Sequence, residues 1–172
     1  TEANAFLSRE LAARMASLTA LLRREIAVYI ARSGKILGVS VGHADNVALD
    51  DFGLRRSSRR LSRVRCIHTH PNGDATLSDV DLFAVVSLRL DAICALGVDE
   101  RGEITGATAS FLAPDEEGSL RAGPVEALDA ASLDDPRLME RVAGNDRMMT
   151  ASEQETQEER ERAYLVSVDS EQ

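Results

Sequence analysis

Apolar residues recur at three- and four-residue steps through residues 6–24, which is the spacing of one face of an amphipathic α-helix. From residue 25 the pattern changes to β-branched residues in loose alternation, on both sides of the short turn "RSGK". Residues 25–42 are therefore predicted to form a β-hairpin. A further strand is expected at residues 46–49, "NVAL".

The middle of the chain combines short strands with one helix. Residues 64–70 are predicted to be a strand, "PNGD" after them a turn, and a helix is expected to begin at Ser78. Residues 89–98 then have the apolar character of a buried strand, and residues 103–113 that of its hairpin partner across "DERG". This order of elements predicts an α+β domain built around a mostly antiparallel or mixed sheet.

The pattern weakens after Pro114. Residues 125–143 are expected to form one or two short helices, and residues 152–162 are polar and acidic, as in a solvated helix or a linker. The apolar run "AYLVSV" near the end looks like the beginning of another folded unit. The expected organisation is a domain over 1–142, a polar linker over 143–162 and the truncated start of a following domain over 163–172.

Composition places the chain among globular proteins, with 172 residues, 44% of them apolar and 28% charged. The formal charge of −9 argues against general affinity for nucleic acids. No apolar run approaches the roughly 18 residues of a membrane span, and the N-terminus lacks a signal-peptide pattern, so a cytoplasmic location is expected. Cys66 and Cys94 lie in apolar stretches; buried reduced thiols are expected, with a disulfide as the alternative.

One basic segment interrupts the acidic chain. A solvated loop is one interpretation of it, and a phosphate-binding patch is the other, since arginine forks suit phosphate. Without interleaved aromatic residues, stacking on nucleic-acid bases is not expected. The six arginines, which could contact ribosomal RNA, are Arg55, Arg56, Arg59, Arg60, Arg63 and Arg65.

Two of the three histidines stand one residue apart in the strand predicted at residues 64–70. Alternate side chains of a strand share a face, so His68 and His70 should lie about 6–7 Å apart and could converge on one ion. Asp81 follows in the first turn of the next helix, from which its carboxylate could reach that strand. Two nitrogens and one oxygen leave a tetrahedral position open, as in catalytic zinc sites. Glu25, at the start of the first strand, is the candidate base.

The same residues also fit a structural interpretation. Ser78 and Asp81 have the spacing of a helix capping box, in which the serine caps the helix and the carboxylate suits its positive end. The metal and capping roles are compatible for Ser78 but compete for Asp81. An isolated H-x-H pair is common and more often has no metal-binding role.

The stretch "HTHPNGDATLSDVD", with Glu25 opening an upstream strand, resembles the JAMM/MPN+ metalloprotease signature of an upstream Glu, H-x-H-P and S-x-x-D. The similarity covers residues 10–113. It implies a JAMM/MPN-like (cytidine-deaminase-like) fold, with a mixed sheet flanked by helices and a C-terminal helical or linker tail. It also implies the site residues: His68, His70 and Asp81 as ligands of zinc or another divalent metal, Glu25 as general base and Ser78 as hydrogen-bond donor to the developing oxyanion.

A second resemblance covers residues 60–98, which are similar to an extra N-terminal domain of some bacterial HflX-type GTPases, proteins associated with ribosomes. The closing "ERAYLVSVDS" resembles the point where the common N-terminal region of that family begins. The chain has no G-x-x-x-x-G-K-[ST] motif, since "RSGKILG" lacks the upstream glycine and has Ile36 in place of Ser/Thr. No GTPase activity is expected here; the resemblance places that chemistry in a downstream domain of a parent chain.

Three functions follow, and the first two belong to different classes. The first is a zinc-dependent peptidase or isopeptidase acting on a peptide substrate, in which Glu25 takes a proton from a metal-activated water. The second is a non-catalytic docking or regulatory domain that acts on the ribosome or on the attached GTPase. A metal-stabilised regulatory domain without any substrate is a third possibility.

Overall fold

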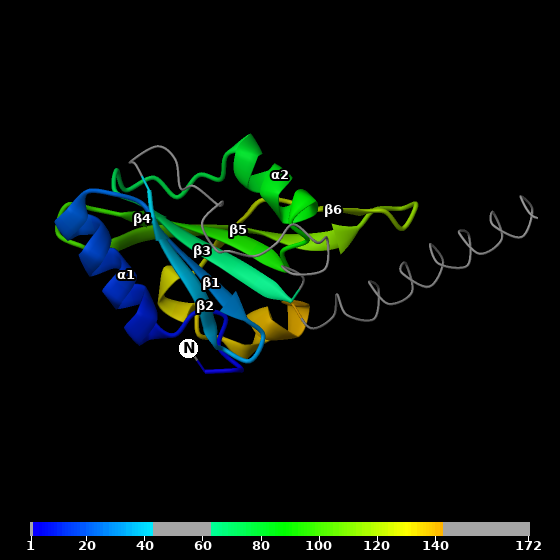
Figure 1. Cartoon of the computed structure of the whole chain (residues 1–172), viewed down its shortest axis with the longest axis horizontal. Coiled ribbons are helices and arrows are strands. Elements are labelled where there is room, and N and C mark those ends of the chain that lie inside the picture. Colours follow the sequence, from blue (N-terminus) through cyan, green and yellow to red (C-terminus); the bar gives the residue numbers. More distant parts are fainter. Residues whose placement is uncertain (1, 43–62, 143–172) are drawn as a thin grey trace, which may run out of the picture.

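The computed structural model describes residues 2–42 and 63–142. Their core is a seven-stranded sheet in the order β2-β1-β3-β4-β5-β6, with β7 also paired to β5 (Figure 1). Among these strands the β3–β4 pair is parallel and the other pairs are antiparallel. The strands are β1 (Ile26–Ala31), β2 (Ile36–Val41), β3 (Val64–His70), β4 (Ala92–Val98), β5 (Ile104–Pro114), β6 (Leu120–Ala122) and β7 (Glu126–Leu128).

Helices cover both faces of the sheet. Helix α1 (Arg9–Leu22) packs on one face, where Met15 joins an apolar cluster with Val28. Helix α2 (Asp79–Ser87) lies on the opposite face, where Val85 joins a second cluster with Tyr29 (Figure 1). The short 3-10 helix η2 (Ala130–Ser132) and a helix that begins at residue 136 follow β7 and contribute to the α1 side. The predicted α+β fold with a mixed sheet is therefore confirmed.

Capping and turn residues explain where α1 begins and ends and where the chain turns between β1 and β2. Ser8 caps α1, its hydroxyl accepting from the Leu11 amide, and the helix ends where Arg23 adopts a left-handed conformation with φ 50°. Gly34, with φ 84°, allows the tight turn between β1 and β2. The predicted hairpin, the H-x-H strand, the helix capped by Ser78 and the β4–β5 pair are all found.

The segment after Pro114 was predicted less well. Strands β6 and β7 were not expected, and residues 126–128 form a strand instead of part of a helix because they pair with Ala107–Ala109 of β5. The strand expected at 46–49, the linker from 143 and the following unit from 163 lie outside the described residues. Among the helices of the described ranges, none combines the length and apolar character needed to cross a membrane.

Arg65 does not belong to an exposed basic patch. Its side chain is buried between β3 and the N-terminal segment, and its guanidinium donates to the carbonyl oxygens of Phe6, Ala31 and Ala5 at 2.7, 2.8 and 3.0 Å. This arginine therefore ties the start of the chain to the sheet. Arg63 is exposed, and the remaining arginines of the predicted patch, Arg55, Arg56, Arg59 and Arg60, lie outside the described residues.

Both cysteines are buried free thiols, as expected. Burial raises the pKa of Cys66 and of Cys94 to about 12, so neither thiol ionises near neutral pH.

Candidate metal centre

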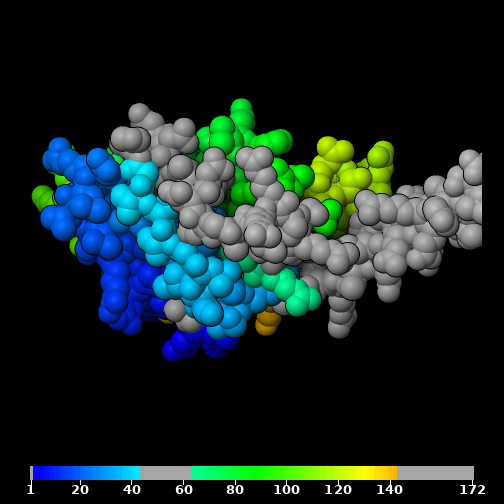
Figure 2. Space-filling model, in the orientation of Figure 1, coloured from blue at the N-terminus to red at the C-terminus, as the bar shows by residue number. Residues whose placement is uncertain are grey.

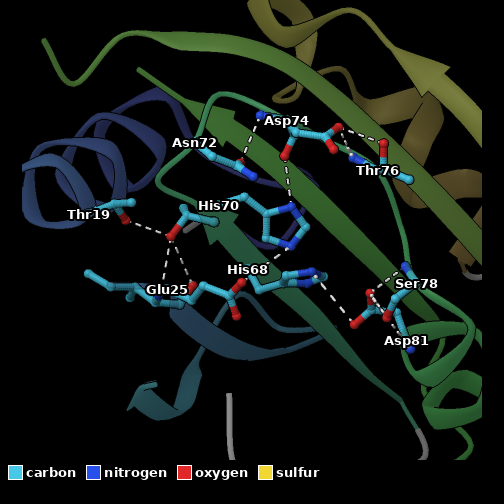
Figure 3. A network of polar contacts seen from close by, with 11 residues as sticks. Thr19, Glu25, His68, His70, Asn72, Asp74, Thr76, Ser78 and Asp81 are labelled. Atoms are coloured by element: carbon cyan, nitrogen blue, oxygen red, sulfur yellow. Dashed lines mark hydrogen bonds and ion pairs between the residues drawn. The ribbon is translucent and has the colours of Figure 1, made fainter. Parts of the chain in front are cut away.

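Strand pairing brings the predicted site residues together. Strand β1 lies antiparallel to β3 with Ala27 opposite His68, so Glu25, just before β1, lies beside His70 at the end of β3. The two imidazole rings are adjacent, with centroids 4.9 Å apart. Helix α2 approaches from the other side and brings Ser78 and Asp81 toward His68 (Figure 3). The expectation that the H-x-H strand lies next to the strand opened by Glu25 is confirmed.

His70 is oriented by the turn that follows it. Its Nδ1 lies 2.7 Å from the backbone oxygen of Asp74. A carbonyl oxygen can only accept, so in the neutral ring Nδ1 carries the proton and Nε2 keeps its lone pair. That Nε2 faces Glu25, with 3.8 Å to Oε1 (Figure 3). The neutral form of the His70 ring thus presents the lone pair of Nε2 toward the carboxylate.

His68 is the least exposed of the five predicted site residues, with 5% of its surface exposed. Its Nε2 is buried and has no hydrogen-bond partner within the described part of the chain; Asp81 Oδ1 lies 3.7 Å away. Burial lowers the pKa of His68 to about 4, against the opposing effect of the Asp81 charge and with a smaller contribution from His70. The ring is therefore neutral at physiological pH.

Asp81 uses its two oxygens differently. Oδ2 accepts hydrogen bonds from the Ser78 amide and hydroxyl, each at 2.7 Å, and the Ser78 hydroxyl accepts from the Asp81 amide at 3.2 Å. This is a complete capping box. Oδ1 instead faces His68. The capping role and a role toward His68 therefore do not compete, contrary to the expectation from sequence.

The hydroxyl of Ser78 does not point at an open position. Its proton is directed to Asp81 Oδ2, so a developing oxyanion would have to compete with that carboxylate for it. In this geometry Ser78 acts as the N-cap of α2. Its hydrogen bonds give no sign of the predicted role as donor to an oxyanion.

Two residues that support the candidate site, Thr69 and Asp74, were not predicted from the sequence. Thr69, between the two histidines, points to the opposite face, where its hydroxyl lies 2.5 Å from that of Thr19 in α1 and accepts from the Ile26 amide at 3.0 Å. These contacts join α1, β1 and β3 directly beside Glu25 (Figure 3). The backbone oxygen of Asp74 is the other. Thr69 could have been suspected, because a polar residue at an inward strand position needs a partner; a backbone oxygen carries no such signal.

The donor groups form two pairs, His68 with Asp81 and His70 with Glu25. As placed, no three His, Cys, Asp or Glu side chains of the described residues lie close enough to hold one ion. No family model, curated protein or solved structure matches the chain.

Proposed function

We propose that this domain binds a divalent metal ion, zinc in the first instance, through His68, His70 and Asp81, and that it hydrolyses an amide bond of a peptide or isopeptide. Two observations support the proposal: the resemblance to the JAMM/MPN+ signature, and the neighbouring positions of the His68–Asp81 and His70–Glu25 pairs at one end of β3. Glu25 is the group assigned to proton transfer.

The observation that carries the proposal is the buried Nε2 of His68. A buried polar atom without a hydrogen-bond partner among the described residues costs free energy, about 1–3 kcal/mol, unless something binds it. The neutral state of this ring is also the state in which an imidazole binds a metal. A cation at this position would satisfy the nitrogen and would be balanced by the neighbouring Asp81 carboxylate.

The ligand atoms of His70 and Asp81 also suit a bound divalent metal ion. The Asp74 oxygen holds the Nδ1 proton of His70, which is the arrangement that leaves Nε2 as a ligand atom and is typical of metal-binding histidines. The capping box fixes Asp81 through Oδ2 and leaves Oδ1 on the histidine side. Because the two pairs are separate as placed, the imidazoles and the carboxylate would turn toward a common centre on binding.

The chemistry divides between the ion and the protein. A bound divalent cation acts as a Lewis acid that makes water acidic enough to react near neutral pH. Glu25 is 8% exposed, and its Oε1 lies 3.8 Å from His70 Nε2, a proposed ligand atom, so its carboxylate would stand beside the bound ion, where a general base is needed. Its carboxylate would accept that proton and return it to the leaving amine.

The test measures binding and hydrolysis separately. Zinc stoichiometry and affinity are determined by elemental analysis and calorimetry for the full chain and for His68→Ala and His70→Ala. The wild type should hold one ion with high affinity, and each alanine variant should lose most of it. A wild-type protein that takes up no zinc, manganese or cobalt would refute the metal site.

Hydrolysis is then followed by mass spectrometry on a mixture of linear peptides and lysine-linked isopeptides. Glu25→Gln should retain the fold and the metal but lose cleavage by at least about 100-fold, because only proton transfer is removed. Equal cleavage by wild type and Glu25→Gln would exclude Glu25 as the base. Metal binding without any cleavage would reduce the proposal to a metal-stabilised domain.

A further inference from the structure

The turn after His70 is held in place by β4 and β5, which lie on the side of β3 away from β1. Residues 71–77 connect β3 to α2, and they contain the Asp74 oxygen that accepts from His70 Nδ1 at 2.7 Å. Within the turn, Asn72 Oδ1 accepts from the Asp74 amide at 3.0 Å, and Asp74 Oδ1 accepts from the Thr76 amide and hydroxyl at 2.9 and 2.6 Å (Figure 3). These bonds give the turn its shape, but they do not attach it to the sheet.

A hydrogen bond at Gly73 attaches the turn to β5. Its carbonyl oxygen accepts a hydrogen bond from the hydroxyl of Thr105, in β5, at 2.7 Å. Gly73 itself has φ +78°, a left-handed conformation that other residues rarely adopt. The bond spans 32 residues of sequence and joins the turn next to the Asp74 oxygen to the β4–β5 hairpin.

Gly97 makes room for this carbonyl. It lies in β4 directly opposite His70 in the parallel register. A Cβ atom on Gly97 would stand 2.3 Å from the Gly73 oxygen, 2.7 Å from the Gly73 carbonyl carbon and 2.8 Å from the Thr105 hydroxyl oxygen. The first two are backbone atoms, so any side chain at 97 would have to displace the turn.

We propose that Thr105 and Gly97 are positioning residues of the candidate metal centre, which hold the Gly73 carbonyl so that the next carbonyl, that of Asp74, keeps the proton of His70 on Nδ1. Held in this tautomer, His70 presents the lone pair of Nε2 toward Glu25. That this positioning serves metal binding rests on the proposed function, but the tautomer itself is a property of the metal-free protein.

The chain offers matched variants. Thr105→Val removes the hydroxyl and keeps the shape, while Thr105→Ser restores the donor. Gly97→Ala introduces the clash, and Gly106→Ala is its control, because Gly106 pairs with Gly97 across β4–β5 and a Cβ there would meet Ala75 at an ordinary 3.6 Å.

The deciding measurement is the tautomer of His70 in the metal-free full chain, read from long-range ¹H–¹⁵N NMR spectra near pH 8, with the resonances assigned through His70→Asn. Wild type, Thr105→Ser and Gly106→Ala should show the Nδ1-protonated ring. Thr105→Val and Gly97→Ala should show a mixture with the Nε2-protonated form. Zinc affinity should fall in parallel, by about tenfold in Thr105→Val, as for other groups that orient metal ligands.

The outcomes separate the two proposals. An unchanged tautomer in Thr105→Val overturns the positioning role, even if zinc affinity falls or if Gly97→Ala fails to fold. A tautomer that changes in Thr105→Val and returns in Thr105→Ser supports the role. If the wild type binds no zinc, the proposed function fails, while the tautomer measurement still decides whether Thr105 and Gly97 orient His70.

Discussion

Replacing Asp81 by asparagine distinguishes two roles of this residue, that of a metal ligand and that of a helix cap. In the folded protein Oδ2 of this residue completes the capping box and Oδ1 faces the buried Nε2 of His68. Asparagine keeps one oxygen acceptor, which can still receive the Ser78 amide and hydroxyl, but it removes the negative charge and leaves an amide group for the other position.

The expected cost in stability is small. The remaining oxygen preserves the capping hydrogen bonds, so the main loss is the interaction of the charge with the N-terminus of α2, about 0.3–1 kcal/mol. Full loss of an N-cap costs about 1 kcal/mol, which sets the upper limit. If Asp81 is a ligand, the loss of zinc affinity should be far larger, at least about 100-fold, because a neutral amide is a poor zinc ligand and the charge that balances the ion has gone.

Two controls isolate the effect. Asp79→Asn removes the same charge from the first turn of α2 at an exposed position, and it should match the stability change of Asp81→Asn without affecting zinc. Ser78→Ala removes the cap and keeps the carboxylate, so it should destabilise more than Asp81→Asn but retain most of the zinc affinity. Urea unfolding of the metal-free proteins gives the change in stability, and zinc calorimetry gives the change in zinc affinity. Full zinc occupancy in Asp81→Asn would refute the three-ligand site.

Two further predictions concern the buried polar groups. The unfolded chain protonates His68 below about pH 6.5 but the folded protein only below about 4, so the metal-free protein should lose about 3 kcal/mol of stability as the pH falls through this range. Urea unfolding at several pH values should show this loss, and His68→Gln should remove it; equal slopes for the two proteins would contradict the burial argument. Arg65→Met should destabilise by about 3 kcal/mol or more, since the buried carbonyl oxygens of Phe6 and Ala5 lose the Arg65 donor and that of Ala31 keeps the Gly34 amide, whereas exposed Arg101→Met should change the melting temperature little. Similar melting temperatures for these two variants would show that the Arg65 contacts contribute little.

Much of the local structure follows from short stretches of sequence. The helix capped by Ser78, the hairpin around Gly34 and the H-x-H strand each carry their own signal in periodicity, capping residues or turn residues. Alternation along a strand also places His68 and His70 on one face. These features depend on neighbours a few residues apart, which is why they could be predicted without knowledge of the fold.

Other features depended on partners distant in the sequence. Strand β7 has only three residues and forms because β5 offers it an edge, a fact with no local signature. Arg65 stands within an arginine-rich run that resembles a surface loop, yet its burial follows from three carbonyls presented by the N-terminal segment and β1. Burial and long-range hydrogen bonds, not composition, decided these positions.

The candidate site combines both kinds of information. Sequence alone named Glu25, His68, His70 and Asp81, because their residue types and spacing form a recognisable pattern. Tertiary structure alone divided the oxygens of Asp81 between the cap and His68, left His68 Nε2 without a hydrogen-bond partner among the described residues, and assigned the Nδ1 proton of His70 to a backbone oxygen. The physical reason is that the protonation and orientation of each group depend on atoms brought next to it by the folded chain, from β1, β3, α2 and the turn held by β5.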